Sequence, residues 1–318
     1  MKSLILKESG LHIENKPFIP NSATKIMEFS NASINHRDLW IVKGQYAGIK
    51  FPVILGSDGA GKCDGEEVIL NPSVNWISDP NTQPKNYEII GLPNDGTFTE
   101  VGCFNPVLIN PKPGHLSMAE AAALPLAGLT AYRLLFSRCK LTQYDKVLIV
   151  GIGGGVALLA AQFALAIGCE VWVISGEDEK IEKAKAMGVK DGVNYKSDNW
   201  HKDLLLKSGG FDVIIDSAGG RQFTQLASVA NAGARIGIYG GTLGKIPELS
   251  PQIIFWKQIS ILGSTMGNHQ EFKEMLSFVN TYKIKPVIDS IYSLEDFKSA
   301  FERMDQGKQF GKIVFEII

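Results

Sequence analysis

Hydrophobic and polar positions follow two different patterns along the chain, and the change comes near residue 117. Beyond it, short apolar runs spaced roughly 20–30 residues apart are separated by segments with helical periodicity, which is typical of repeated strand–helix–strand units. Strands are expected at 146–150, 170–174, 211–216 and 234–239, and helices at 155–167, 177–187 and 223–230. This pattern predicts an α/β region built on a parallel, doubly wound sheet.

The rest of the chain is organised differently. Residues 1–115 carry short apolar runs, such as 53–55 and 67–70, between Pro, Asn and Gly residues, which indicates short strands and irregular loops. The stretch 71–99 is mostly polar and turn-forming, and we expect it to run over the surface. A capping box, Ser117-Met118-Ala119-Glu120, marks the start of a helix between the two regions. The tail is expected to form helices at 270–280 and 294–304 and a strand at 312–317.

Composition and charge narrow the classes of function. Hydrophobic residues make up 45% of the 318 residues and charged residues 20%, so the chain can bury a core and is unlike a disordered protein. The formal net charge of −1 removes the electrostatic basis for nucleic acid or an anionic membrane surface as the main partner. The four cysteines lie far apart in the sequence, so we expect free, buried thiols.

Residues 147–169 contain no charged residue and are long enough to span a bilayer. Their interior is Gly151-Ile152-Gly153-Gly154-Gly155, which would be a poor centre for a membrane helix, so a strand, a glycine turn and a buried helix explain them better. The N-terminal residues lack the apolar run of a secretory signal. We therefore expect a cytoplasmic protein with no membrane partner.

The glycine turn is the main chemical motif. The strand at 147–150 is followed by the candidate phosphate-binding residues Gly151, Gly153, Gly154, Gly155 and Val156. The free amides and the positive end of the following helix face such a turn, and glycine lets a pyrophosphate come close to the backbone. A second strand at the right distance favours this interpretation over a tight turn without a ligand.

The end of the second strand bears on the choice of dinucleotide. NAD sites usually place Asp or Glu there, about 20 residues past the glycines, to bind the ribose 2′-hydroxyl. In this chain the strand ends at Ser175-Gly176, and Lys180 follows one turn later, so a 2′-phosphate would meet a hydroxyl and a positive charge. This favours NADP(H) over NAD(H). The acidic residues 177–179 are also typical of a helix start, where they complement the helix dipole.

Several further motifs occur in a fixed order: Asn35-His36-Arg37-Asp38-Leu39-Trp40, Gly44-Gln45-Tyr46, Leu55 to Gly61, Ala121 to Tyr132, Phe211 to Gly219 and Gly311-Lys312-Ile313-Val314. Together with the glycine turn, they resemble the medium-chain dehydrogenase/reductase family, and within it the zinc-independent quinone oxidoreductase-like branch. The resemblance implies a GroES-like, mostly-β catalytic domain at 1–115 and a Rossmann dinucleotide-binding domain at 116–260. A C-terminal segment, 261–318, would complete the sheet and return to the catalytic domain, with the cofactor in the cleft.

Zinc alcohol dehydrogenases of the same family hold a catalytic zinc with a Cys, a Gly-His-Glu motif and a second Cys. At these places this chain has Asn35, Gly56-Ser57-Asp58 and Leu126, and residues 71–99, where a four-Cys zinc lobe would lie, contain no cysteine. A zinc site needs three or four convergent ligands, so we expect none here. The resemblance then implies hydride transfer to an acceptor that is already electrophilic, either a quinone or an α,β-unsaturated carbonyl.

The resemblance also implies roles for single residues. The catalytic residues are expected to be Asn35 and Tyr46, over the nicotinamide, and Thr130, against the ring or its ribose. The 2′-phosphate is expected to contact Ser175, Lys180, Tyr195 and Lys312. The other cofactor-binding residues are expected to be Ser217 and, close to the carboxamide, Gly240 and Gly241.

Two other functions stay open. No residue is an obligatory general acid or nucleophile, so a non-catalytic NADPH-binding protein, like the crystallin-related members or a cofactor sensor, is one alternative. An alcohol dehydrogenase is the other, and the missing zinc ligands argue against it. The resemblance also implies a homodimer formed by an edge strand near 258–262. Because Gly61 is followed almost at once by Asp64-Gly65-Glu66-Glu67-Val68, one hairpin of the catalytic domain is expected to be short.

Overall fold

The structure, a computed structural model, describes residues 1–21 and 24–317. Within these residues the chain forms two compact units: the first comprises 1–129 and the described part of 266–318, and the second comprises Thr130–Thr265. Both divisions lie later in the chain than the expected domain boundaries, and helix α2 (Met118–Ala122) packs against strands of the first unit. No helix in the described residues is long and apolar enough to cross a membrane.

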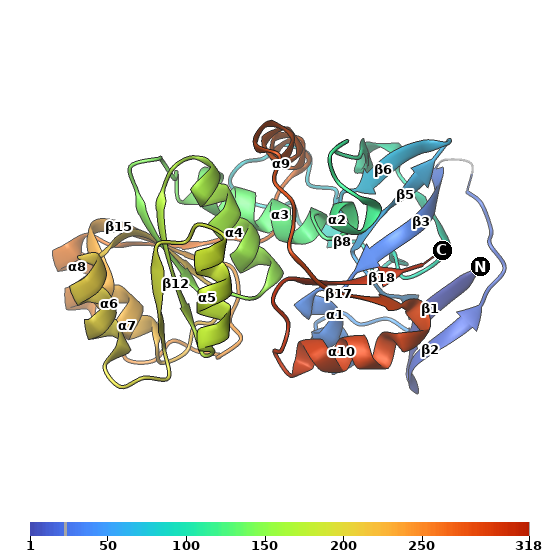
Figure 1. Cartoon of the computed structure of the whole chain (residues 1–318). Helices are drawn as coiled ribbons and strands as arrows, with labels where there is room; N and C mark the ends of the chain where they lie inside the picture. The colour runs from blue at the N-terminus through green and yellow to red at the C-terminus, as the bar shows by residue number, and fades with distance from the viewer. Residues whose placement is uncertain (22–23, 318) are drawn as a thin grey trace. The chain divides into compact units, whose positions relative to one another are not determined.

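Strands dominate the first unit (Figure 1). Its larger sheet has the order β10-β6-β5-β3-β18-β17, with β9 also paired to β3, and a second sheet has the order β2-β1-β4. The strands are β1 (Lys2–Lys7), β2 (Gly10–Asn15), β3 (Lys25–Ser33), β4 (Val53–Ile54), β5 (Asp58–Cys63), β6 (Glu66–Leu70), β7 (Ser73–Val74), β8 (Glu88–Ile89), β9 (Val101–Phe104), β10 (Ile109–Pro111), β17 (Ile288–Ser293) and β18 (Lys312–Glu316). The helices of this unit are α1 (His36–Val42), α2, α9 (His269–Tyr282) and α10 (Phe297–Asp305), and α3 (Pro125–Tyr132) runs on into the second unit.

The C-terminal strand β18 belongs to the interior of the first unit. It pairs antiparallel with β3, with Val314 opposite Ser33, and parallel with β17. Its first residue is Lys312, so this pairing carries a lysine side chain from the end of the sequence into the unit built by the N-terminal strands.

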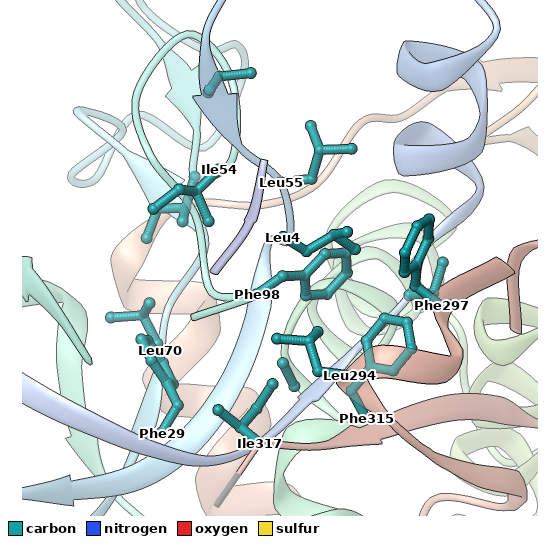
Figure 2. Packing of buried hydrophobic residues seen from close by; sticks show 14 of the residues in the cluster. Leu4, Phe29, Ile54, Leu55, Leu70, Phe98, Leu294, Phe297, Phe315 and Ile317 are labelled. Carbon is teal, nitrogen blue, oxygen red and sulfur yellow. The ribbon is translucent and has the colours of Figure 1, made fainter. Parts of the chain in front are cut away.

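Residues from both ends of the chain form the hydrophobic core of the first unit (Figure 2). The rings of Phe98 and Phe315 meet edge to face, with centroids 5.1 Å apart. Leu4 and Leu294, from opposite ends of the chain, lie in the same cluster. Burying a side chain of this size contributes about 1.5–3 kcal/mol, which holds the C-terminal segment in place.

The hairpin between β5 and β6 is as short as the sequence indicates. Cys63 pairs with Glu66, and only Asp64 and Gly65 lie between them. Both turn residues have positive φ, 52° and 85°, which is the conformation of a two-residue type I′ turn and suits Asp-Gly. The short hairpin is therefore a regular tight turn.

The second unit contains a parallel sheet with the order β13-β12-β11-β14-β15-β16. Its strands are β11 (Lys146–Val150), β12 (Glu170–Ser175), β13 (Asp191–Asn194), β14 (Phe211–Asp216), β15 (Ala230–Ile238) and β16 (Ser260–Gly263). Its helices are α4 (Gly155–Ala166), α5 (Asp178–Ala186), α6 (Trp200–Ser208), α7 (Phe223–Val229) and α8 (Pro251–Lys257). Helices α4 and α5 cover one face of the sheet and α6, α7 and α8 the other, as expected for a doubly wound fold (Figure 1).

The local pattern of apolar and polar residues predicts most elements of this unit, but it does not predict two of its helices. The segment of α4, rich in Ala and Leu, forms a helix because these are the strongest helix formers, and most of its apolar side chains are buried. Helices α6 and α8 were not predicted. Every residue of α8 is at least partly exposed, so it has no regular apolar stripe that could be recognised in the sequence.

Candidate active site

The glycine turn between β11 and α4 is tied to the neighbouring strand. The amides of Gly151 and Ile152 both donate to the carbonyl of Ile174, at 2.9 and 3.1 Å. Gly151 and Gly153 have φ of 71° and 135°, values that favour glycine. Gly154 is the N-cap of α4 without a capping side-chain hydrogen bond, so the first amides of the helix are available to a ligand. A Cβ added at Gly154 would enter open space. These features fit the pyrophosphate of a dinucleotide.

The residues expected at the 2′ position gather at the end of β12. Ser175 accepts from the amide of Tyr195 at its carbonyl (3.0 Å) and from the amide of Glu177 at its Oγ (3.2 Å). A Cβ at Gly176 would lie 2.8 Å from the Tyr195 hydroxyl, so glycine lets the tyrosine lie close. Lys180 Nζ lies 3.0 Å from Glu177 Oε1. The structure thus brings three of the four expected residues around one turn, together with an acidic residue.

Asp216 shapes the loop after β14. The residue is fully buried, and its carboxylate accepts the amides of Ala218 (2.9 Å) and Gly219 (3.0 Å). Burial raises the pKa of this carboxyl, and the two amides act against the rise. Ser217 is therefore held between a strand and a carboxylate-braced turn at the carboxyl edge of the sheet, where parallel sheets bind their ligands.

Ser217 meets the loop after β15. A Cβ at Gly240 would lie only 2.8 Å from the carbonyl oxygen of Ser217, so this close approach requires glycine, whereas a Cβ at Gly241 would enter open space. Burial raises the pKa of the Tyr239 hydroxyl, and the neighbouring Ser217 side chain acts in the opposite direction. The sequence analysis missed Tyr239. Its place directly before two glycines at a strand end is the signal that could have found it.

In the first unit, the buried carboxylate of Asp58 accepts hydrogen bonds from the residues at the other places that the resemblance associates with zinc ligands. Asp58 Oδ2 accepts from Asn35 Nδ2 (2.9 Å), Lys312 Nζ (3.0 Å) and Ser33 Oγ (3.2 Å). Its Oδ1 accepts from the amide of Leu126 (2.8 Å). The Asp58 side chain is 0% exposed and that of Lys312 4%. The three places that the resemblance assigns to zinc ligands, Asn35, Asp58 and Leu126, therefore lie together, and the other two donate hydrogen bonds to Asp58.

Lys312 does not have the role that the resemblance implied. Its Nζ donates to Asn35 Oδ1 at 2.6 Å and forms an ion pair with Asp58. The expectation that Lys312 binds a 2′-phosphate conflicts with this geometry, because a buried ammonium that is already neutralised has no free charge for a phosphate. The sequence could not indicate this, since only the pairing of β18 with β3 turns the residue inward.

Asn35 lies at the N-terminus of α1 and is held from a second side. Its backbone amide donates to Asp38 Oδ2 at 2.8 Å. Asp38 is fully buried, and burial raises its pKa to about 6, although the Arg37 charge and the Asn35 amide act in the opposite direction. The sequence analysis proposed Asn35 from the resemblance, and the structure adds the network that fixes it.

Tyr46 packs against a buried guanidinium. The central carbon of the Arg37 guanidinium lies 5.2 Å from the centroid of the Tyr46 ring, within the range of a cation–π contact. Arg37 Nη1 donates to Ser57 Oγ (2.6 Å) and to the carbonyl of Ile90 (2.9 Å). The sequence analysis quoted Arg37 within a motif but gave it no role, since the sequence does not show that its guanidinium is buried. Thr130 is buried on α3 at the start of the second unit, and its role stays a prediction.

Comparison with known proteins shows which family the chain belongs to. A family profile described as "Zinc-binding dehydrogenase" matches residues 155–281. The "Zinc-type alcohol dehydrogenase-like protein YogA" of Leptosphaeria maculans is 33% identical, in a match that covers 96% of this chain and 94% of that protein. The chain belongs to the medium-chain dehydrogenase/reductase family.

Two further family members show the range of names among the relatives. "Quinone oxidoreductase-like protein 2" of Bos taurus is 26% identical and covers 99% of this chain and 90% of its own length. A solved structure of an NAD-dependent alcohol dehydrogenase matches with a TM-score of 0.92 at 29% identity, covering 100% of both chains. The GroES-like and Rossmann architecture expected from the sequence is confirmed, and the chain is an NAD(P)H-dependent oxidoreductase of this family.

The name of the matching profile implies zinc, and the residues of the first unit do not fit it. Zinc alcohol dehydrogenases of the family have zinc ligands at three places. Here these places hold the Asp58 carboxylate, which already accepts from several donors, the Asn35 side chain, whose oxygen faces Lys312, and Leu126, whose backbone amide donates to Asp58. An ammonium 3.0 Å from Asp58 would repel a dication at the same place. Within the described part of the chain, no group of three or more His, Cys, Asp or Glu side chains is arranged to hold a metal ion.

Proposed function

We propose that this family member is a zinc-independent, NADPH-dependent reductase that transfers hydride to a quinone or an α,β-unsaturated carbonyl. The observation that carries the proposal is the buried ion pair of Lys312 and Asp58 at the place where the family resemblance locates zinc ligands. A centre with this donor set has no Lewis acid to make an alkoxide accessible near neutral pH. Quinones and enones accept hydride without that help, because the developing charge delocalises onto oxygen.

When bound, a nicotinamide dinucleotide supplies the hydride. The uncapped amides of α4, which follow Gly154, would bind its pyrophosphate. Ser217, Gly240 and Gly241 would line the nicotinamide end, since they lie at the carboxyl ends of β14 and β15 and present close backbone there. These residues bind and orient the cofactor, and none of them needs to exchange a proton.

The preference for NADPH is supported by the end of β12. Ser175 is neutral there, and Lys180 and Tyr195 lie around the same turn. Lys180 pairs with Glu177, so a 2′-phosphate would have to replace the Glu177 carboxylate as the partner of this ammonium. The phosphate carries more charge than one carboxylate, which favours the exchange.

On the acceptor side, Asn35 and Tyr46 are the candidate hydrogen-bond donors. The Tyr46 hydroxyl can give its proton to the acceptor oxygen as negative charge develops, and solvent can restore it. Arg37 holds the ring of Tyr46 from one face and is itself anchored by Ser57. Thr130 would orient the nicotinamide or its ribose, as the resemblance implies.

Oxidation of NADPH and of NADH should be measured in parallel with one ortho-quinone, one para-quinone and one enone. Faster turnover with NADPH is expected. If NADPH quenches tryptophan fluorescence while no acceptor is consumed, the protein is a non-catalytic NADPH-binding module. A preference for NADH would contradict the cofactor assignment and leave hydride transfer to these acceptors standing.

The names of two relatives favour a second candidate, an alcohol dehydrogenase. This function would show as oxidation of a simple primary or secondary alcohol with NAD⁺ or NADP⁺, lost on chelation and restored by added zinc. Given the donor set around Asp58, we expect neither that oxidation nor an effect of zinc. Zinc-dependent alcohol oxidation would overturn the proposal of a metal-independent reductase.

A homodimer is also proposed, with the second unit as its interface. Strand β16 lies at the end of the sheet order, so one of its edges pairs with no other strand of the described residues. Ile261 on this strand and Phe255 and Trp256 on α8 are exposed, a combination that a second copy would cover. Sedimentation should give a dimer that Ile261→Lys dissociates and the control Leu206→Lys, at an exposed position on α6, does not. The cytoplasmic location stays a prediction.

A further inference from the structure

The side chain of Asn35 closes a triangle with two opposite charges. Its Oδ1 accepts from Lys312 Nζ at 2.6 Å, and its Nδ2 donates to Asp58 Oδ2 at 2.9 Å. Lys312 and Asp58 are themselves 3.0 Å apart. Each of the three residues is at most 7% exposed, so little water competes for the contacts among them.

These two charges determine which way the Asn35 amide faces. An ammonium can only donate hydrogen bonds and an ionised carboxylate can only accept them. Turning the amide by 180° would place its NH₂ group against Lys312 and its carbonyl oxygen against Asp58, and both contacts would be repulsive. Only one orientation is therefore compatible with Lys312 and Asp58.

This orientation leaves one N–H of the amide for a ligand. Asn35 Nδ2 carries two N–H groups, and one of them bonds to Asp58. None of the hydrogen bonds that Asn35 makes to the described residues uses the other N–H, and Asn35 itself is only 7% exposed. A donor on a residue this buried costs free energy unless something accepts its proton, and a ligand from outside the chain can supply that acceptor.

We propose that Lys312 and Asp58 are positioning residues that hold the Asn35 amide so that its second N–H donates to the carbonyl oxygen of the hydride acceptor. This inference rests on the proposed function and names the residue set that recognises the acceptor. The acceptor class is a compound with a conjugated carbonyl oxygen, which a single amide N–H can bind without a metal.

The second N–H of Asn35 can speed hydride transfer because negative charge develops on the acceptor oxygen during the reaction. When an enone is reduced, a C–H bond forms at the β-carbon and the C=C electron pair moves towards the oxygen, which becomes negative. A donor aimed at that oxygen binds the transition state more tightly than the ground state. Lys312 strengthens the donor because its charge at Oδ1 polarises the amide. The proton that completes the product comes from Tyr46 or solvent.

The test is a double-mutant cycle with Asn35→Ala and Lys312→Met, read as kcat for the enone and KM for NADPH. Losing one such donor lowers kcat by about 100-fold in other enzymes, and we expect a loss of this order for Asn35→Ala. Lys312→Met is expected to lower kcat about 10-fold, with little change in KM for NADPH. If Lys312 acts through Asn35, the double variant equals Asn35→Ala alone.

Lys312→Met leaves the Asp58 carboxylate buried without its counter-ion, so its loss of kcat could come from misfolding. A second variant separates the two causes. Lys312→Met combined with Asp58→Asn removes both charges and still frees the Asn35 amide, so it should show the same loss of kcat with a melting temperature near that of wild type. Lys25→Met serves as the control, since it breaks only an exposed ion pair with Asp64. It should leave kcat unchanged.

The outcomes separate the two proposals. If wild type turns over the enone and the losses from Asn35→Ala and Lys312→Met multiply, Lys312 acts independently and the inference is wrong, while the proposed function stands. Unchanged kcat in both charge variants would overturn it as well. If wild type reduces neither quinones nor enones, the proposed function fails and the inference falls with it.

Discussion

Lys312 and Asp58 form an ion pair inside the first unit, with Nζ and Oδ2 3.0 Å apart, although 254 positions separate them in the sequence. Such a pair stabilises a fold only when further hydrogen bonds compensate for the lost hydration. Here Ser33, Asn35 and the amide of Leu126 supply them. The pair thereby joins the C-terminal strand β18 to β5 and places a charged centre where the resemblance locates zinc ligands.

The stability of the first unit should depend on keeping this pair whole. Asp58→Asn leaves the Lys312 ammonium buried without a counter-charge, and breaking a buried pair in this way costs about 3–5 kcal/mol. Adding Lys312→Met should restore most of the free energy of unfolding, because no unpaired charge remains. Urea denaturation at pH 7 measures both variants. Equal stability of the single and double variants would contradict this account.

The buried carboxyl of Asp38 should make the free energy of unfolding depend on pH. Burial raises its pKa from 3.8 to about 6, so the folded state binds this proton more tightly than the unfolded state. The stability it contributes is complete below about pH 4 and is lost as the pH rises through 6. Asp38→Asn has no such loss and keeps an acceptor for the Asn35 amide. Its stability relative to wild type should grow by up to about 3 kcal/mol between pH 4 and 7.

Denaturation curves across that pH range check the prediction. The charges around Asp38 are those of Arg37 and Lys312, which lower its pKa, and of Asp58, which raises it. Asp289→Asn is the matched comparison with the opposite sign, because hydrogen bonds from Arg303 and Phe310 lower the pKa of Asp289 despite its burial. A pH-independent difference between Asp38→Asn and wild type would show that Asp38 titrates normally.

Gly154→Ala should weaken dinucleotide binding without harming the fold. The added methyl group meets no atom of the described residues within 4 Å, and the φ of −78° suits alanine. It would instead occupy space in front of the uncapped helix amides that a pyrophosphate needs. Fluorescence titration should show a rise of roughly tenfold or more in the Kd for NADPH, about 1.4 kcal/mol. Gly114→Ala, also in open space but in the first unit, is the control.

Lys180→Met tests the 2′-phosphate assignment. Removing the ammonium should raise the Kd for NADPH several-fold and leave the Kd for NADH nearly unchanged, because only NADPH carries the second charge. Lys183→Met, on the same helix and paired with Glu179 at an exposed position, should affect neither cofactor. Equal losses for NADPH and NADH would place Lys180 away from the 2′-phosphate.

Much of the second unit could be predicted because its signals are local. Strands β11 and β14 have the predicted bounds, since each is a continuous apolar run that a buried parallel strand requires. The glycine turn was recognised for the same reason, because glycine and a helix start lie side by side in the sequence. Helix α8 was missed, since it leaves every residue at least partly exposed.

The candidate site of the first unit was only partly predictable. Asn35 and Tyr46 were named from motifs, whereas Arg37 carries no pattern of its own and gains meaning only by packing on the Tyr46 ring. Lys312 was assigned to a phosphate, because its charge is visible in the sequence and its burial is not. Charge alone indicates what a side chain can bind, and only its neighbours show what it does bind.

The sequence by itself determined the α/β architecture, the glycine turn and the absence of cysteine or histidine at the expected zinc positions. These features follow from residue type, periodicity and short spacing, which are properties of neighbouring residues. The tertiary structure alone decided that Lys312, Asp58 and Asn35 meet. Their contact depends on β18 pairing with β3, a contact between the two ends of the chain whose register is set by burial of Phe315 and its neighbours in the core.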